Sequence, residues 1–134
     1  MRLLLDTHIW LWSELEPERL SQRVSSAIQD TDNELWLSPL SVWELIVLWQ
    51  KRRILPGEDI ETWIPQALRA LPLQEATITY EVAREVARLR LVHHDPADRF
   101  LVATARVFDL TLVTADERLM KVRETSILAN RESG

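Results

Sequence analysis

The chain has 134 residues, 46% of them hydrophobic, which suits one folded domain and excludes a disordered chain. Cys is absent, so disulfides, thiolate metal ligands and thiol nucleophiles are excluded. The net charge of −5 argues against binding nucleic acid mainly through electrostatic attraction, so such a contact must be short or assisted by bound cations.

The first forty residues predict two short buried strands separated by helices. An apolar run ends at Asp6 and predicts a strand followed by a tight turn. Pro17 marks a break, and Ser21 is a suitable cap for the helix that follows. The predicted elements are strands over 3–5 and 35–37 and helices over 8–13 and 22–29.

Neither a targeting segment nor a membrane span is expected. Asp6 interrupts the apolar N-terminal run, and no small-residue cleavage site follows it. No stretch reaches the ~18 apolar residues of a membrane helix. We therefore expect a cytoplasmic protein with no membrane contact.

The middle of the chain predicts two further helices. Ser38-Pro39 combines a good N-cap with a good first helical residue, and that helix should run to about Arg52. Apolar residues at helical spacing predict another helix over 60–71. Because Pro65 lies inside this pattern, we expect a kink or a late start there.

The second half of the chain continues the alternation of strands and helices. Strands are expected from Leu73, over 110–113 and over 126–128, and helices over 80–89, from Asp95-Pro96 to Phe108, and as a short turn over 116–122. Short apolar strands that alternate with helices predict an α/β fold with a mainly parallel sheet, here as one domain over 1–134.

Asp6 and Asp116 both stand just after apolar strands. Sites in parallel sheets form beyond the carboxyl ends of the strands, so these two carboxylates could meet at one edge. An Asp after a strand is also a common helix cap, and each residue taken singly fits both interpretations.

Glu44 is the most informative acid. It is the one polar residue in VWELIVLW (42–49), and a helix that is apolar on all sides is expected to be buried. A buried carboxylate is unfavourable unless it is paired or binds a cation. The alternative is a capping box from Ser41 to Glu44, but the start at Ser38-Pro39 places Glu44 in the second turn.

Asp98 lies three residues after Asp95, at the start of a predicted helix. Asp95 is the better N-cap, which leaves Asp98 to project from the first turn. An acid in the first turn also stabilises a helix without any further role.

A cluster of these four acids would suit divalent cations. Mg²⁺ and Mn²⁺ prefer oxygen ligands, and two such ions can drive phosphodiester cleavage. The three histidines, His8, His93 and His94, lack the paired spacing of a zinc site, and two Gly cannot form a phosphate-binding loop. A phosphatase is a remote alternative, because Asp6-Thr7-His8 lacks a second Asp.

Four segments resemble the PIN-domain family, and more closely its VapC-type toxins of prokaryotic toxin–antitoxin modules. They cover nearly the whole chain in the family's order and spacing: LLLDTHIWLW (3–12), SPLSVWELIVLWQKRRI (38–54), HDPADRFLVATA (94–105) and LTLVTADERL (110–119).

The resemblance implies a three-layer α/β/α sandwich and an Mg²⁺- or Mn²⁺-dependent endoribonuclease. The family's catalytic and metal-binding acids fall on Asp6, Glu44, Asp98 and Asp116. Thr114 matches a small hydroxyl residue near the last acid. Arg99 could contact a phosphate, although pairing with a nearby acid is the better expectation.

The resemblance also implies an RNA substrate, a cognate antitoxin protein and a homodimer. All six Trp lie at or before residue 63, and Trp is enriched in interfaces. We assign Trp36 and Trp43 to the core, and Trp10, Trp12 and Trp49 to a possible antitoxin groove. The alternative function is a catalytically silent PIN-like module that binds an antitoxin or regulator.

Overall fold

The computed structural model describes residues 1–91 and 95–132; His93 and His94 lie outside these ranges. The strands are β1 (Arg2–Leu5), β2 (Glu34–Leu37), β3 (Leu73–Glu75), β4 (Thr111–Thr114) and β5 (Ile127–Ala129). The helices are α1 (Thr7–Leu15), the 3₁₀ turn η1 (Pro17–Arg19), α2 (Gln22–Gln29), α3 (Pro39–Gln50), α4 (Ile60–Ala70), α5 (Tyr80–Val86), α6 (Pro96–Phe108) and α7 (Glu117–Met120).

The five strands form one parallel sheet in the order β3-β2-β1-β4-β5. β2 and then β3 are added on one side of β1. The chain then crosses over, and β4 and β5 are added on the other side of β1. The direction of winding therefore reverses between β1 and β4. In open α/β sheets this switch point is where ligands bind.

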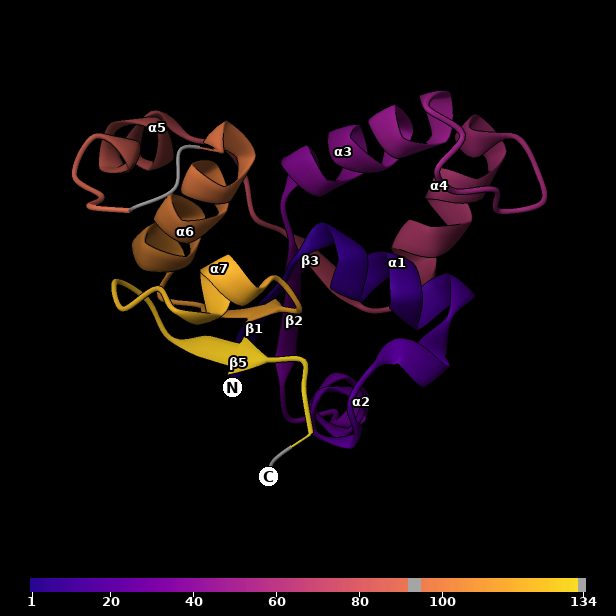
Figure 1. The fold of residues 1–134 in the computed structure, drawn as a ribbon, viewed down its shortest axis with the longest axis horizontal. Helices are drawn as coiled ribbons and strands as arrows, with labels where there is room; N and C mark the ends of the chain where they lie inside the picture. The colour runs from indigo at the N-terminus through magenta and orange to yellow at the C-terminus, as the bar shows by residue number, and fades with distance from the viewer. Residues whose placement is uncertain (92–94, 133–134) are drawn as a thin grey trace.

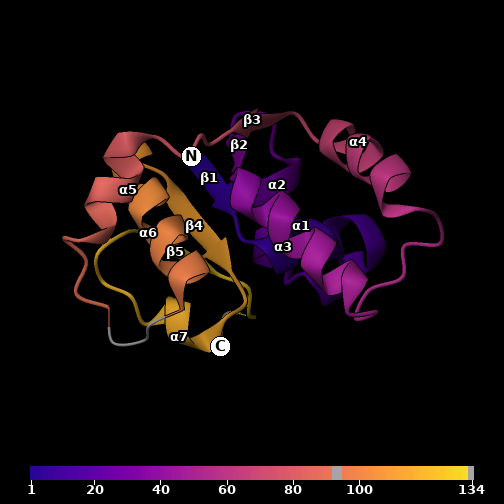
Figure 2. The same cartoon turned by 90° about the horizontal axis from the view of Figure 1, so that it is seen from above.

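Alternation along the strands divides the core between the two faces of the sheet. Leu3 and Leu5 pack with apolar side chains of α1, α2, α3 and α4, whereas Leu4 packs with those of α5, α6 and α7. Figures 1 and 2 show the strands between these two groups of helices. The predicted parallel sheet and its three-layer arrangement are confirmed.

The predicted helix starts are confirmed by their caps. The side chain of Ser21 accepts a hydrogen bond from Val24 N, and that of Ser38 accepts one from Leu40 N. Of the two outcomes expected at Pro65, a kink or a late start, the late start is wrong, because the helix already begins at Ile60, where the Asp59 side chain caps it, and Pro65 lies inside it.

The tryptophan assignments need two corrections. Trp10 is fully buried in the core, so it cannot line a groove. Trp43, expected in the core, is 57% exposed, because α3 presents one of its apolar sides to solvent. The same fact overturns the prediction that α3 is buried on all sides. Only Ser41 and Leu45 of this helix are fully buried.

Trp36, Trp12 and Trp49 are each partly buried. Trp36 packs against the core beneath α5 and α6, stacks on Phe108 and receives the Arg2 guanidinium on its ring. Trp12 and Trp49 pack against the opposite core cluster. These two remain candidates for a groove, with Trp43 as a third.

None of the helices in residues 1–91 and 95–132 has the length and apolar character needed to cross a membrane.

The positions of the two corrected tryptophans predict opposite stability effects. Trp10→Ala should lower the free energy of unfolding by about 3–5 kcal/mol, because it leaves a large cavity in the core. Trp43→Ala should change it by less than about 0.5 kcal/mol, because its side chain is mostly solvated. Urea unfolding followed by circular dichroism measures both, and a similar loss in both variants would contradict the assignment.

Candidate functional site

One cavity of about 370 Å³ brings together all four predicted acids. We call it the acidic cavity; it is lined by Asp6, His8, Trp12, Glu44, Asp95, Asp98, Ala115, Asp116 and Arg118. Its carboxylates come from the ends of β1 and β4 and from α3 and α6. Segments far apart in the sequence thus meet beyond the carboxyl ends of the strands.

Thr114 joins the two acids that follow β1 and β4. Its hydroxyl donates a hydrogen bond to Asp6 Oδ2 at 2.7 Å, and the Asp116 backbone N–H donates to the same hydroxyl at 3.0 Å. Asp6 N also donates to the Val113 carbonyl at 2.9 Å, which extends the β1–β4 pairing to the first acid. Thr114 is fully buried, so this arrangement is rigidly supported.

The environment of Asp6 disfavours the ionised form of its carboxyl group. Burial raises its pKa, and the nearby Asp116 charge adds to this effect. The hydrogen bonds from Thr114 and from the Thr7 backbone act in the opposite direction but do not cancel the increase. The residue therefore gains from any cation placed beside it.

Glu44 reaches the acidic cavity from the second turn of α3. The Thr7 hydroxyl lies 3.0 Å from Glu44 Oε1 and 3.0 Å from the Ser41 hydroxyl. Burial raises the pKa of Glu44, the Thr7 hydrogen bond lowers it, and the charges of Asp6 and Asp95 raise it further. Thr7 and Ser41 were not predicted as site residues, since a Thr or Ser near a helix start gives no distinct sequence signal.

The two acids at the start of α6 separate as predicted. Asp95 caps the helix by accepting hydrogen bonds from Ala97 N and Asp98 N. Asp98 projects into the cavity, and its side chain is 13% exposed. Burial, and then the charges of Asp95, Asp6 and Asp116, raise the pKa of Asp98 to about 7, against a smaller lowering by Arg118.

Arg118 supplies the positive charge of the acidic cavity. Its Nη2 lies 3.6 Å from Asp98 Oδ2 and 3.4 Å from Asp116 Oδ2. Burial acts to raise the pKa of Asp116, but hydrogen bonds from the Arg118 side chain and from the Arg118 and Leu119 backbone outweigh it, and the pKa is lowered. Asp116 also caps α7.

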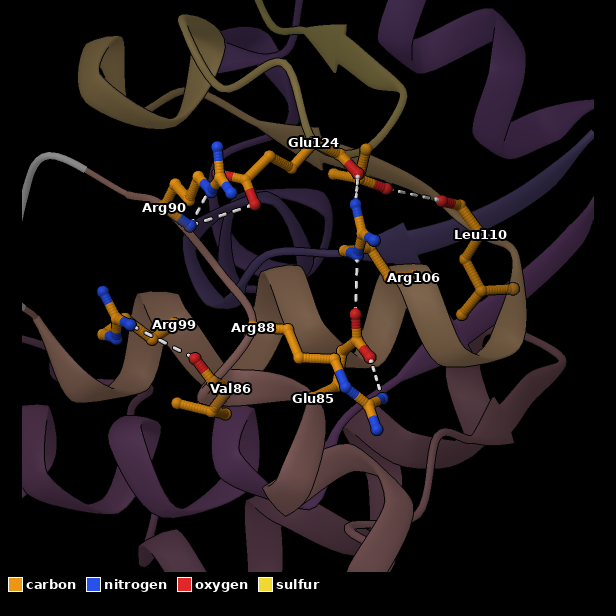
Figure 3. Close-up of polar contacts among 9 residues, drawn as sticks. Glu85, Val86, Arg88, Arg90, Arg99, Arg106, Leu110 and Glu124 are labelled. Carbon is orange, nitrogen blue, oxygen red and sulfur yellow. Dashed lines mark hydrogen bonds and ion pairs between the residues drawn. The ribbon is translucent and has the colours of Figure 1, made fainter.

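The sequence analysis singled out a different arginine. Arg99 was expected to contact a phosphate or a nearby acid, but its guanidinium donates to the Val86 carbonyl at 3.2 Å, as Figure 3 shows. This bond joins α6 to α5, and Arg99 is not among the residues that line the acidic cavity. Arg118 was missed because its placement depends on how the short helix α7 follows β4.

In residues 1–91 and 95–132, no group of three or more Asp, Glu or His side chains is arranged to hold a metal ion as it stands. The carboxylates are instead engaged by Thr7, Thr114 and Arg118. Their gathering in one cavity is therefore the structural observation, and the roles of the four acids stay a prediction.

Comparison with known sequences identifies the family. The sequence profile of the PIN domain matches residues 3–125. The chain belongs to the PIN domain family. Over 122 residues it is also 37% identical to Ribonuclease VapC22 of Mycobacterium tuberculosis, an alignment that covers 90% of this chain and 92% of that protein.

Solved structures confirm the PIN-like fold. VapBC2 from Rickettsia felis, bound to a DNA fragment from its promoter, contains a chain that aligns with a TM-score of 0.74 at 14% identity, covering 96% of this chain and 98% of that chain. FitAcB from Neisseria gonorrhoeae gives a TM-score of 0.65 at 20% identity over 96% of this chain and 97% of that chain. At these identities the likeness concerns the fold alone.

The opposite pKa shifts of Asp98 and Asp116 predict opposite effects of neutralising them in this PIN domain. The raised pKa of Asp98 means that the folded state holds its proton up to about pH 7, whereas the unfolded chain releases it near pH 4. Stability from this group is therefore fully present below about pH 4 and is lost as the pH rises from there to about 7. Asp116, with a lowered pKa, stabilises the fold when ionised and loses this contribution only in acid.

Asp98→Asn should therefore raise the Tm of the metal-free protein only slightly at pH 5, where the loss of stability has just begun, and by the full amount at pH 8. Allowing for solvent screening, the gain is about 1 kcal/mol, or about 4 °C. Asp116→Asn should lower the Tm at both pH values, because the amide can still cap α7 but no longer carries the negative charge that pairs with Arg118 and with the helix N-terminus. Differential scanning calorimetry in EDTA measures both, and a lower Tm for Asp98→Asn at pH 8 would refute the assigned charge crowding.

Proposed function

We propose that this chain is a metal-dependent endoribonuclease and the toxin of a type II toxin–antitoxin pair. The observation that carries the proposal is the acidic cavity, in which acids from four separate segments face one another. The 37% identity to a protein named as a ribonuclease supports RNA as the substrate.

The donor set of the acidic cavity fits Mg²⁺ or Mn²⁺. Asp6, Glu44, Asp98 and Asp116 offer only carboxylate oxygens, which these ions prefer. Burial, and to a lesser extent mutual repulsion, raises the pKa values of Asp6, Glu44 and Asp98, so a cation beside them would stabilise their charged forms. When bound, such ions activate water and stabilise the leaving oxygen of a phosphodiester.

The residues of the chain then have separate roles in this proposal. Asp6, Asp98 and Asp116 hold the cation, and Glu44 either binds it or orients the attacking water. Thr114 positions Asp6 and Asp116 relative to each other through its two hydrogen bonds. A divalent cation would compete with Arg118 for Asp98 and Asp116, since the guanidinium lies within 3.6 Å of both carboxylates.

Neutralising the acids should abolish RNA cleavage. Asp6→Asn and Asp98→Asn should each lower the rate of cleavage of a single-stranded RNA by about 100-fold or more in Mn²⁺, because each removes a cation ligand. Asp95→Asn should keep the rate within about threefold, since Asn is an equally good N-cap. Asp59→Asn, which changes the cap of the distant α4, serves as the control for capping alone.

Cleavage is measured on gels with a labelled RNA, and Mn²⁺ binding by titration calorimetry on the same proteins. Equal cleavage by Asp6→Asn and the wild type would remove Asp6 from the site. Binding of Mn²⁺ without any cleavage, over a broad set of RNAs, would favour the alternative of a silent PIN-like binding module.

The solvated side of α3 supports an antitoxin as the partner. Trp43 is 57% exposed, and Val42, Ile46, Val47, Leu48 and Trp49 on the same helix are only partly buried. An exposed apolar surface of this kind is typical of a protein interface. A solved structure of similar fold, from Klebsiella pneumoniae, is a toxin–antitoxin complex, which agrees with this use. The expected homodimer stays a prediction.

The α3 surface can be tested with the product of the reading frame adjacent to this gene. When the two are co-expressed, Trp43→Ser should reduce recovery of the partner by about tenfold or more, as expected for an aromatic interface residue. Tyr80→Ser is the matched control, because Tyr80 is 92% exposed on α5. Equal recovery with both variants would place the partner elsewhere.

A further inference from the structure

A second cavity adjoins the acidic one and carries the opposite charge. It has a volume of about 450 Å³ and is lined by Arg90, Leu91, Arg118, Lys121, Val122, Arg123 and Glu124. We call it the basic cavity. Its four cations and one carboxylate contrast with the net charge of −5 of the whole chain. The excess of positive charge is therefore local to this cavity.

Glu124 stabilises one side of the basic cavity through hydrogen bonds to two other segments. Its carboxylate accepts hydrogen bonds of 3.0 and 3.1 Å from the Arg90 backbone N–H, and its carbonyl accepts one of 2.7 Å from Arg106 Nη1. Arg106 is held in turn by Glu85 at 2.9 Å, and Figure 3 shows this chain of contacts. The segment after α5 and the segment before β5 are thus fixed to each other.

The lining of the basic cavity combines apolar side chains with cations. Leu91 and Val122 are partly buried, whereas Arg90, Lys121 and Arg123 are exposed. A free phosphate needs only the cations, and a peptide of Asp and Glu residues offers no flat ring for the apolar wall. A nucleotide matches both parts, because its base has an apolar face and its phosphate is an anion.

Arg118 connects the two cavities. It lines the basic cavity, and its guanidinium also contacts Asp98 and Asp116 in the acidic cavity at 3.6 and 3.4 Å. A nucleic-acid strand with one phosphodiester at the acids would therefore place a neighbouring nucleotide at the basic cavity.

We propose that the basic cavity is the subsite for the RNA nucleotide next to the scissile phosphodiester. The base lies against Leu91 and Val122. The phosphates of this nucleotide are bound by Arg118, Lys121 and Arg123. The inference rests on the proposed function, because it takes the substrate of the acidic cavity to be RNA.

The test measures binding without cleavage. A fluorescein-labelled single-stranded RNA 12-mer is titrated with the full-length protein in EDTA, and fluorescence anisotropy gives the dissociation constant between 50 and 200 mM KCl. The double variant Lys121→Ala/Arg123→Ala should bind about tenfold more weakly. Its slope of log affinity against log salt should be shallower by about 1.4, since each phosphate contact contributes about 0.7.

The matched control is Arg23→Ala/Arg69→Ala, which removes two exposed cations from α2 and α4. It should bind within about twofold of the wild type. Unchanged binding by the Lys121/Arg123 variant, or an equal loss in the control, would overturn the proposal. A loss of RNA binding found only in Lys51→Ala/Arg53→Ala would also overturn the proposal, because it would place the RNA at the end of α3.

Two further probes separate a nucleotide from other anions. A 12-mer of abasic ribose phosphates should bind about tenfold more weakly than RNA, because stacking of a base contributes about 1–3 kcal/mol. Polyglutamate of equal charge should not displace the RNA at similar concentrations. Equal binding of the abasic strand, or displacement by polyglutamate, would show a general anion surface or a peptide site instead.

Failure of the subsite differs from failure of the proposed function. If RNA is cleaved but its dissociation constant is insensitive to Lys121 and Arg123, the subsite is wrong and the nuclease stands. If RNA binding depends on these residues but no RNA is cleaved in Mn²⁺, the nuclease is wrong and the basic cavity is still an RNA site.

Discussion

Repulsion among carboxylates at the switch point of the sheet governs the site of this protein. β1 and β4 are parallel neighbours, so Asp6 and Asp116, which follow them, are brought to the same edge. Asp98 and Glu44 then enter from helices on the two sides of the sheet. The pKa of Asp98 is raised to about 7, first by burial and then by the charges of Asp95, Asp6 and Asp116. Thr114 and Arg118 offset part of it, through a buried hydroxyl and an exposed guanidinium respectively.

The division of the core explains why these acids can be placed so closely. Each strand sends alternate side chains to α1–α4 on one face and to α5–α7 on the other, so the sheet is fixed from both sides. Hydrogen bonds also hold the residues that follow the strands. Asp6 N donates to the Val113 carbonyl of β4, and Asp116 N donates to the hydroxyl of Thr114, the last residue of β4. The part of the acidic cavity that Asp6 and Asp116 form is thus fixed by the edge of the sheet.

The strands, most helix starts and the four acids could be predicted from the sequence. Strand ends and caps give local signals: Asp6 interrupts an apolar run, and Asp95-Pro96 is a strong helix start. The environment of the tryptophans could not be predicted in the same way. α1 and α3 are both rich in apolar residues, and nothing local indicates that α1 buries Trp10 while α3 leaves Trp43 exposed. That difference is decided by which other helices cover each one.

Arg118 was missed for a similar reason. Its charge is visible in the sequence, but its role depends on the direction in which the four-residue helix α7 leaves the end of β4. Arg99 gave the more prominent signal beside Asp98, yet its guanidinium turns to the Val86 carbonyl. Contacts between segments distant in sequence decide which cation joins the site, and no spacing rule carries that information.

Asp6 and Asp95 cap α1 and α6, so both of these helices begin at the acidic cavity. The aligned peptide dipoles of a helix place the equivalent of about half a positive charge at its N-terminus. The backbone itself therefore contributes positive partial charge beside the carboxylates. This contribution does not change with pH and, unlike a bound ion, cannot dissociate. The N-termini of α1 and α6 therefore offset part of the repulsion among the acids while the protein folds, without any bound cation.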